Sequence, residues 1–448
     1  MHIIEHMFEF VPTADVPQVR AAIACLKSYG GAATDDAERV DLLRALEELK
    51  CVAEATQAAI AADLDDSQRA QQHALGVKVA RRGRGVAAQV ALARRESPRR
   101  GRQHLGLARV LRDELPYTWA AFRDGRITEW RATVIARETA CVSLQDRLAM
   151  DRAIAGDPDA LEGYSDRVVF SELHKLAARI DPASVAARRR RAEADRHVSV
   201  RPAPDTMAYL TVLLPVAQAA AAYAALSVAA DSATAAGDPR SRGQLMADTL
   251  VARVTGAPVA ADGRPVVPVA IGLVMTDRAL LSGAHDTAHL DGHGPIPAGL
   301  ARELVADHLD SCARAWLRRL YTSPATGELV AMDSRQRLFR GSLREAINLR
   351  DQFCRSPWCN APIRHRDHVT GVASGGSTAA AEGQGLCEDC NYAKEAPGWA
   401  ARPRPGPGHA VNTTTPTGRT YTSYAPPLVA LRAGVFRQVG PGRWVLVA

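Results

Sequence analysis

Four cysteines form two closely spaced pairs in the last quarter of the chain. Four residues separate Cys354 from Cys359, two separate Cys387 from Cys390, and 27 lie between the pairs. Two such pairs on tight turns can place four thiolates around one Zn²⁺ ion. The ion would organise a segment with little hydrophobic core of its own, because metal-binding energy becomes folding energy. The spacing therefore predicts a structural zinc site.

Two other chemistries use cysteines at short spacing. A redox-active C-x-x-C motif requires one pair next to a βαβ unit, and this segment has two pairs. An iron–sulfur cluster would use the same four ligands and stays open as a second interpretation. The remaining cysteines are isolated in Ala- and Leu-rich sequence, which predicts buried apolar residues and not a disulfide framework.

Ionisable and amide side chains lie inside and just after this cysteine frame. Asp367 and His368 are adjacent, so at the end of a strand they can point in different directions, one toward a metal and one toward a substrate. Asn391 follows the second cysteine pair directly, and Lys394 comes three residues later on a predicted helix. Oxygen ligands together with a histidine base are what metal-assisted phosphodiester cleavage requires.

The segment 351–399 resembles the four-cysteine variety of the HNH endonucleases, which have the ββα-metal fold. The matching motifs are Asp367-His368, the Gly375-Gly376 loop with Thr378, and GLCEDCNYAK from Gly385 to Lys394. The resemblance implies that His368 is a general base for water. It also implies that Asp367 and Asn391 hold one catalytic ion, Mg²⁺ or Mn²⁺, with Asn391 standing where many relatives carry a final histidine.

Glu382 departs from the family pattern, because relatives carry an asparagine there that pins the loop behind the histidine. A carboxylate cannot donate hydrogen bonds as an amide does, and its charge could compete for the ion. Two hypotheses therefore stay open: a DNA endonuclease or nickase, and a zinc-stabilised nucleic-acid-binding protein that has lost cleavage. A helical scaffold whose zinc domain binds a partner protein is a third.

Several basic residues point to DNA as the partner. Arg364, Arg366 and Lys394 lie in the motif and are predicted phosphate contacts, with solvated surface side chains as the alternative. From Lys78 to Arg109 the chain has ten Lys or Arg and one acid, whereas the whole chain carries a net charge of +7. A local excess of this size is typical of phosphate binding.

The elements that position these residues follow from periodicity and composition. With 448 residues, the chain is too long for a single core. After a loosely ordered lead-in at 1–34, leucine and alanine periodicity predicts a mainly α region at 35–196. An α+β continuation is expected at 197–335, a small ββα-metal domain at 340–400, and a Pro/Gly-rich linker with a terminal hairpin at 401–448.

The upstream region also resembles a known family. LRDELPYTWAAFRDGRITEWRATVIA, GQLMADTLVARVTG and GHGPIPAGLAREL are similar to the actinobacterial helical domain of unknown function 222, which commonly precedes an HNH segment. The two resemblances together cover about residues 35–400. This domain has no established activity, so the resemblance predicts architecture and not chemistry.

No membrane segment is expected. The N-terminus lacks the basic and apolar regions of a signal peptide, which favours a cytoplasmic protein. Thr206 to Ala230 is uncharged over 25 residues, but Pro215 divides it into a strand-like half and an alanine-rich helical half. No Walker loop, dinucleotide fingerprint or G-x-S-x-G motif is present, so nucleotide hydrolysis and serine esterase chemistry have no support. The sequence does not indicate an oligomeric state.

Overall fold

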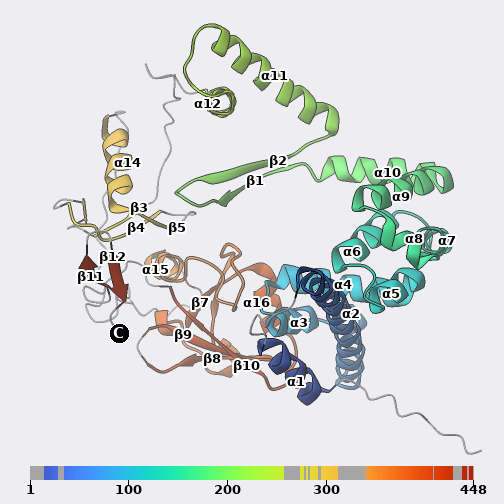
Figure 1. Ribbon diagram of the computed structural model, residues 1–448. Coiled ribbons are helices and arrows are strands. Elements are labelled where there is room, and N and C mark those ends of the chain that lie inside the picture. Colours follow the sequence, from blue (N-terminus) through green and yellow to red (C-terminus); the bar gives the residue numbers. More distant parts are fainter. Residues whose placement is uncertain are drawn as a thin grey trace, which may run out of the picture.

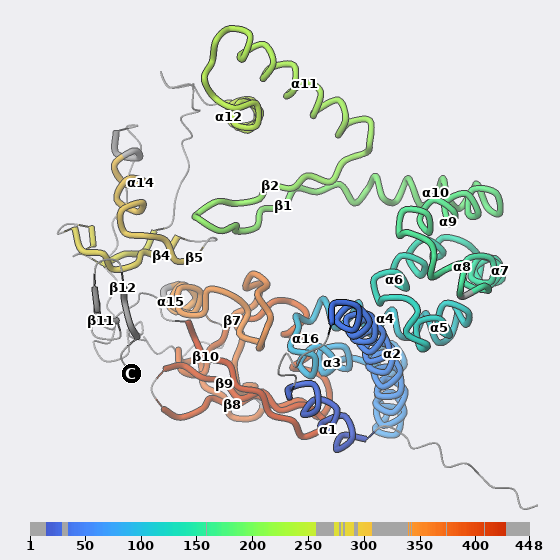
Figure 2. The backbone as a smooth tube through the Cα atoms, viewed as in Figure 1, coloured from blue at the N-terminus to red at the C-terminus, as the bar shows by residue number. Residues whose placement is uncertain are grey.

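The computed structural model shows an N-terminal helical region and a C-terminal module of small sheets and short helices (Figures 1 and 2). The structure describes these residues: 15–28, 35–256, 273–276, 279–280, 283–290, 294–310, 339, 341–406, 408–426, 436–440 and 443–446.

The helical region confirms the predicted mainly α N-terminus. Its elements are α1 (Val16–Lys27), α2 (Asp36–Ala74), η1 (Val79–Arg81), α3 (Val86–Arg94), α4 (Pro98–Glu114), α5 (Pro116–Arg123), α6 (Glu129–Glu138), α7 (Leu144–Ala155), α8 (Pro158–Gly163), α9 (Asp166–Ile180) and α10 (Pro182–Ala194). The expected loosely ordered lead-in differs, because it contains α1, whose first turn is fixed by a capping box between Asp15 and Gln18.

Helix α2 carries the core of this region on one face. Ala55, Ala58 and Ala62 recur every three or four residues and are buried, so the neighbouring helices approach α2 closely. Phe122 and Met150 are completely buried on the other side of the same cluster. The core therefore rests on small aliphatic side chains with few aromatic rings, as the 5% aromatic content predicts.

The middle of the chain mixes strands and helices. Its elements are β1 (His197–Pro202), β2 (Ala208–Leu213), α11 (Val216–Ala235), α12 (Arg242–Thr255), β3 (Leu273–Val274), β4 (Ala288–Leu290), β5 (Gly294–Ile296) and α14 (Ala298–Asp310). β1 and β2 form an antiparallel hairpin that leads away from α10, with α11 and α12 beyond it (Figure 1). Pro215 does separate a strand from a helix, and none of the described helices is long and apolar enough to span a membrane.

The four-cysteine module, as we call described residues 339–426, contains the site. Its elements are α15 (Gly341–Asp351), β6 (His365–His368), η2 (Val372–Ser374), η3 (Ala380–Glu382), β7 (Gly383–Leu386), α16 (Glu388–Lys394), β8 (Ala400–Arg404), β9 (Ala410–Thr414) and β10 (Thr420–Tyr424). β6 and β7 form an antiparallel hairpin, and α16 follows β7 directly.

The linker predicted from residue 401 is wrong for its first part. Residues 400–424 form a three-stranded antiparallel sheet in the order β10-β9-β8. The Pro, Gly and Thr residues that indicated a linker lie partly in its two turns, and Thr side chains pair across its strands, as at Thr414 and Thr420. Farther on, β11 (Phe436–Gly440) and β12 (Arg443–Leu446) pair antiparallel at the C-terminus, where a hairpin was expected.

Candidate metal centre

The four paired cysteines come together in one buried cluster. Their sulfur atoms all lie within 4.8 Å of one another, and all four residues are buried. Cys359 Sγ and Cys387 Sγ are 3.7 Å apart. Four sulfurs at ~2.3 Å from a central zinc would be ~3.8 Å apart along each edge of the tetrahedron. The cluster is therefore arranged to hold a metal ion of this size.

Backbone hydrogen bonds shape the two turns that carry the cysteines. In the first, Cys354 N donates to Ala361 O at 2.9 Å and Cys359 N donates to Ser356 O at 3.0 Å. In the second, Cys387 is the N-cap residue of α16, and its sulfur accepts from Cys390 N at 3.5 Å. Each pair is thus preorganised by its own turn, as the short spacing predicted.

The sulfurs differ in proton affinity because they are crowded. Hydrogen bonds from Cys354, Cys359 and Cys390 lower the pKa of Cys387, so one thiolate is favoured. The pKa of Cys390 is raised, because its thiol is held as a hydrogen-bond donor to Cys354, Cys359 and Cys387 and because it is buried. Four sulfurs in this arrangement require a cation before all can ionise.

A buried ionic cluster, which the sequence analysis missed, braces the module. Asp351 accepts hydrogen bonds from Arg350 Nε at 2.7 Å, Arg355 Nη1 at 3.1 Å and Gly385 N at 2.7 Å, and its side chain has no exposed surface. Arg355 Nη2 also donates to His409 O at 2.9 Å and Ser423 O at 3.0 Å. One arginine beside Cys354 therefore ties the first cysteine turn to β9 and β10.

Asp367 and His368 occupy the end of β6, opposite Gln384 and Gly383 of β7. His368 Nε2 lies 2.8 Å from Thr378 Oγ1, and the imidazole centroid lies 4.7 Å from that of Phe339. A Cβ at Gly383 would lie 2.5 Å from Ile347 Cδ1, so the glycine lets the Ile347 side chain of α15 pack closely on the hairpin. The histidine ring is thus held from two sides.

Asp367 and Asn391 meet the chemical requirement for a divalent ion. Asp367 Oδ2 and Asn391 Oδ1 are both buried and accept no hydrogen bond from any described residue. Lys394 Nζ forms an ion pair with Asp367 Oδ2 that lacks hydrogen-bond geometry. A hard cation takes oxygen ligands of this kind, so the two residues fit a Mg²⁺ or Mn²⁺ ion.

The predicted phosphate contacts are not equivalent. Arg364 is exposed at the start of the hairpin. Arg366 Nε instead donates to Asn348 Oδ1 of α15 at 2.6 Å, and burial lowers the pKa of Arg366. The Lys394 side chain is only 9% exposed, which places it inside the site and not on the surface.

Glu382 takes part in the loop behind the histidine through its backbone. Val369 N donates to Glu382 O at 2.7 Å. The side-chain atom Glu382 Oε2 is buried and accepts no hydrogen bond from the described residues. An asparagine at this position would offer a donor as well as an acceptor.

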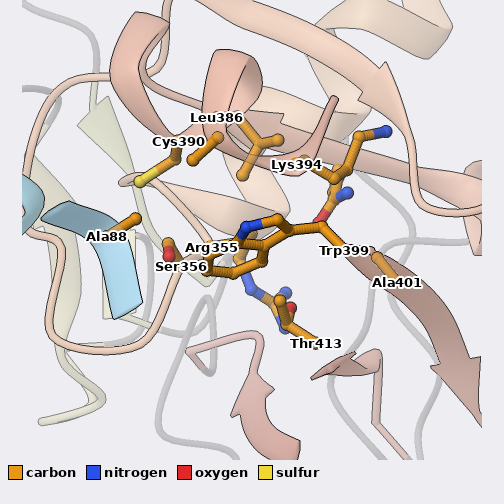
Figure 3. A pocket seen from close by; sticks show the side chains of 11 residues that line it. Ala88, Arg355, Ser356, Leu386, Cys390, Lys394, Trp399, Ala401 and Thr413 are labelled. Carbon is orange, nitrogen blue, oxygen red and sulfur yellow. The ribbon is translucent and has the colours of Figure 1, made fainter. Parts of the chain in front are cut away.

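The helical region contacts the helix that carries the site. Arg102 of α4 forms an ion pair with Asp389, and the Arg84 guanidinium lies 5.1 Å from the centroid of the Tyr392 ring; both partners belong to α16. Figure 3 shows Ala88 of α3 at the edge of a cavity of about 20 Å³ that is also lined by Cys390 and Trp399. Part of the basic stretch predicted to bind DNA therefore holds the four-cysteine module.

The structure defines a two-part chain, in which a helical region is followed by a four-cysteine segment. The model of the family described as "Domain of unknown function (DUF222)" matches residues 43–351, and the chain belongs to this family. The match ends at Asp351, so α15 belongs to the family region although it packs on β6 and β7. No curated protein and no solved structure matches the chain.

Proposed function

We propose that this protein is a zinc-stabilised, metal-dependent HNH-type endonuclease or nickase that hydrolyses DNA phosphodiester bonds. The observation that carries this proposal is that Asp367 Oδ2 and Asn391 Oδ1 are buried oxygens without a hydrogen-bond donor among the described residues, and that Asp367 adjoins His368 at the end of β6. Metal-assisted hydrolysis requires oxygen ligands for a divalent ion and a base for the attacking water. Zinc in the cysteine cluster would be structural, because all four of its positions are taken by protein sulfurs.

The residues of the site have separate roles in this proposal. A divalent ion held by Asp367 and Asn391 would stabilise negative charge on the phosphate and on the leaving oxygen. His368 would accept the proton of the attacking water, and the contact of its Nε2 with Thr378 Oγ1 at 2.8 Å holds the ring in place. Phe339 packs against the imidazole and keeps its plane constant.

Exposed cations near α16 support DNA as the substrate. Arg364 lies on the hairpin, and η1 to α4 contribute four exposed cations that have no acidic partner in the described part of the chain: Lys78, Arg81, Arg95 and Arg99. The contacts of Arg84 and Arg102 with α16 hold this basic segment beside the site. Several exposed cations on elements that contact α16 favour a long polyanion over a small phosphate ester.

Nicking of supercoiled plasmid tests the proposal. Zinc-loaded protein with Mg²⁺ or Mn²⁺ is expected to convert supercoiled DNA to open circles, and His368→Ala is expected to lose this activity, since one general base contributes about 10²- to 10⁴-fold. His365→Ala is the matched control, because His365 lies in the same strand and contacts Tyr392 instead of the site. Equal rates for wild type and His368→Ala would refute the proposal.

Glu382 favours one alternative, a nucleic-acid-binding protein that has lost cleavage. Its Oε2 is buried in the loop behind His368 and accepts no hydrogen bond from the described residues. In this case wild type binds DNA with a steep salt dependence and does not cut it. Glu382→Asn should then restore cleavage, and an inactive Glu382→Asn protein would exclude Glu382 as the cause.

A further inference from the structure

Lys394 makes two contacts inside the candidate ion site. Its ammonium Nζ forms the ion pair with Asp367 Oδ2 and donates a hydrogen bond to His368 O at 2.6 Å. The exposed fractions of the two side chains are 9% for Lys394 and 24% for Asp367. The positive charge therefore lies against the oxygen that faces the expected ion, and little water screens it.

The position of Lys394 on α16 makes this contact specific. Lys394 lies three residues after Asn391, so both side chains project from the same side of the helix. Cys387 and Cys390 fix the start of the same helix in the cysteine cluster. The lysine is consequently brought to Asp367 by the same framework that presents Asn391.

The Lys394 ammonium and a bound divalent ion compete for Asp367. Mg²⁺ binds carboxylate oxygen at about 2.0–2.1 Å, and a second cation on the same carboxylate would repel it. The ammonium also lies 3.7 Å from Glu395 Oε1, and this 60% exposed carboxylate offers it another partner when it leaves Asp367.

We propose that Lys394 is a built-in cation that neutralises Asp367 in the metal-free protein and that the divalent ion must displace. This inference rests on the proposed function, because it takes Asp367 and Asn391 as ion ligands. It makes Lys394 a residue that sets the metal affinity, and not a surface phosphate contact. The protein would load only at ion concentrations high enough to overcome the internal competitor.

Binding of Mn²⁺ to full-length, zinc-loaded protein tests the inference, with free Mn²⁺ measured by electron paramagnetic resonance. Lys394→Met removes the competing charge and is expected to tighten binding roughly tenfold to a hundredfold, within the range of effects that a neighbouring cation has on a carboxylate. Lys394→Arg keeps the charge and should bind Mn²⁺ about as wild type does. Arg364→Met, which removes a nearby exposed cation, is expected to change affinity by less than about threefold.

The outcomes separate this inference from the proposed function. Unchanged or weaker Mn²⁺ binding by Lys394→Met would overturn it, because the lysine would then only support Asp367. If neither wild type nor Lys394→Met binds Mn²⁺, or if Asp367→Asn binds as tightly as wild type, the ion site itself is refuted and the inference is refuted with it. Zinc content and circular dichroism of each variant show that the four-cysteine module has folded.

Discussion

Asp351→Asn should loosen the four-cysteine module more than any surface change. Among the described residues, Asp351 is the carboxylate that pairs with Arg350 and Arg355, whose side chains are 10% and 2% exposed, and the substitution removes its charge. The new amide NH₂ group would also face Gly385 N–H or an arginine N–H, and two donors cannot form a hydrogen bond with each other. Removing one partner from a buried ionic cluster costs about 3–5 kcal/mol.

Hydrogen exchange of the β7 amides measures this loss locally. Since 1.36 kcal/mol is a factor of ten, the expected change in exchange rate is about 150-fold to 5,000-fold. Asp389→Asn is the matched control, because Asp389 is 37% exposed in its pair with Arg102 and should change the rate less than about fivefold. An Asp351→Asn protein whose β7 exchange rises less than tenfold would refute the view that this cluster braces the site.

Three more predictions concern the metal, the helical contact and pH. Cys390→Ser should abolish the one bound zinc per chain, measured by elemental analysis, because three sulfurs cannot close the tetrahedron; full zinc occupancy would contradict this. Arg102→Glu should weaken the contact with α16 by up to about 1 kcal/mol, measured by thermal unfolding. Adding Asp389→Arg should recover most of this loss. No recovery would argue against the ion pair between residues 102 and 389. Burial lowers the pKa of His409 to about 4. As pH falls, the unfolded state therefore takes up this proton at a higher pH than the folded state does. The stability linked to His409 is then present above about pH 6.5 and is lost as pH falls toward 4. A His409→Gln protein that loses stability over this range as steeply as wild type would contradict this role.

Local sequence patterns predicted the parts of the fold that local interactions form. Leucine and alanine periodicity indicated the helical region, because one apolar face is enough to specify an amphipathic helix. The spacing of Cys354, Cys359, Cys387 and Cys390 indicated their cluster, because short turns bring each pair together regardless of the rest of the chain.

Contacts between distant residues were not predictable in the same way. Asp351 looks like any acid at the end of an amphipathic helix, and its role depends on Arg355 and Gly385 folding around it. The β8–β10 sheet has a linker composition, and long-range contacts of Arg355 with Ser423 and the burial of Val411 hold it in place. The pairing of Lys394 with Asp367 likewise required the relative placement of α16 and β6.

Anomalous X-ray diffraction from crystals soaked in Mn²⁺ tests the central claim most directly. Data at the zinc and manganese absorption edges locate each metal separately. The account predicts one zinc among the four cysteine sulfurs and one manganese between Asp367 and Asn391, with Lys394 withdrawn from the carboxylate. A cysteine cluster without zinc, or manganese bound away from Asp367 and Asn391, would contradict it.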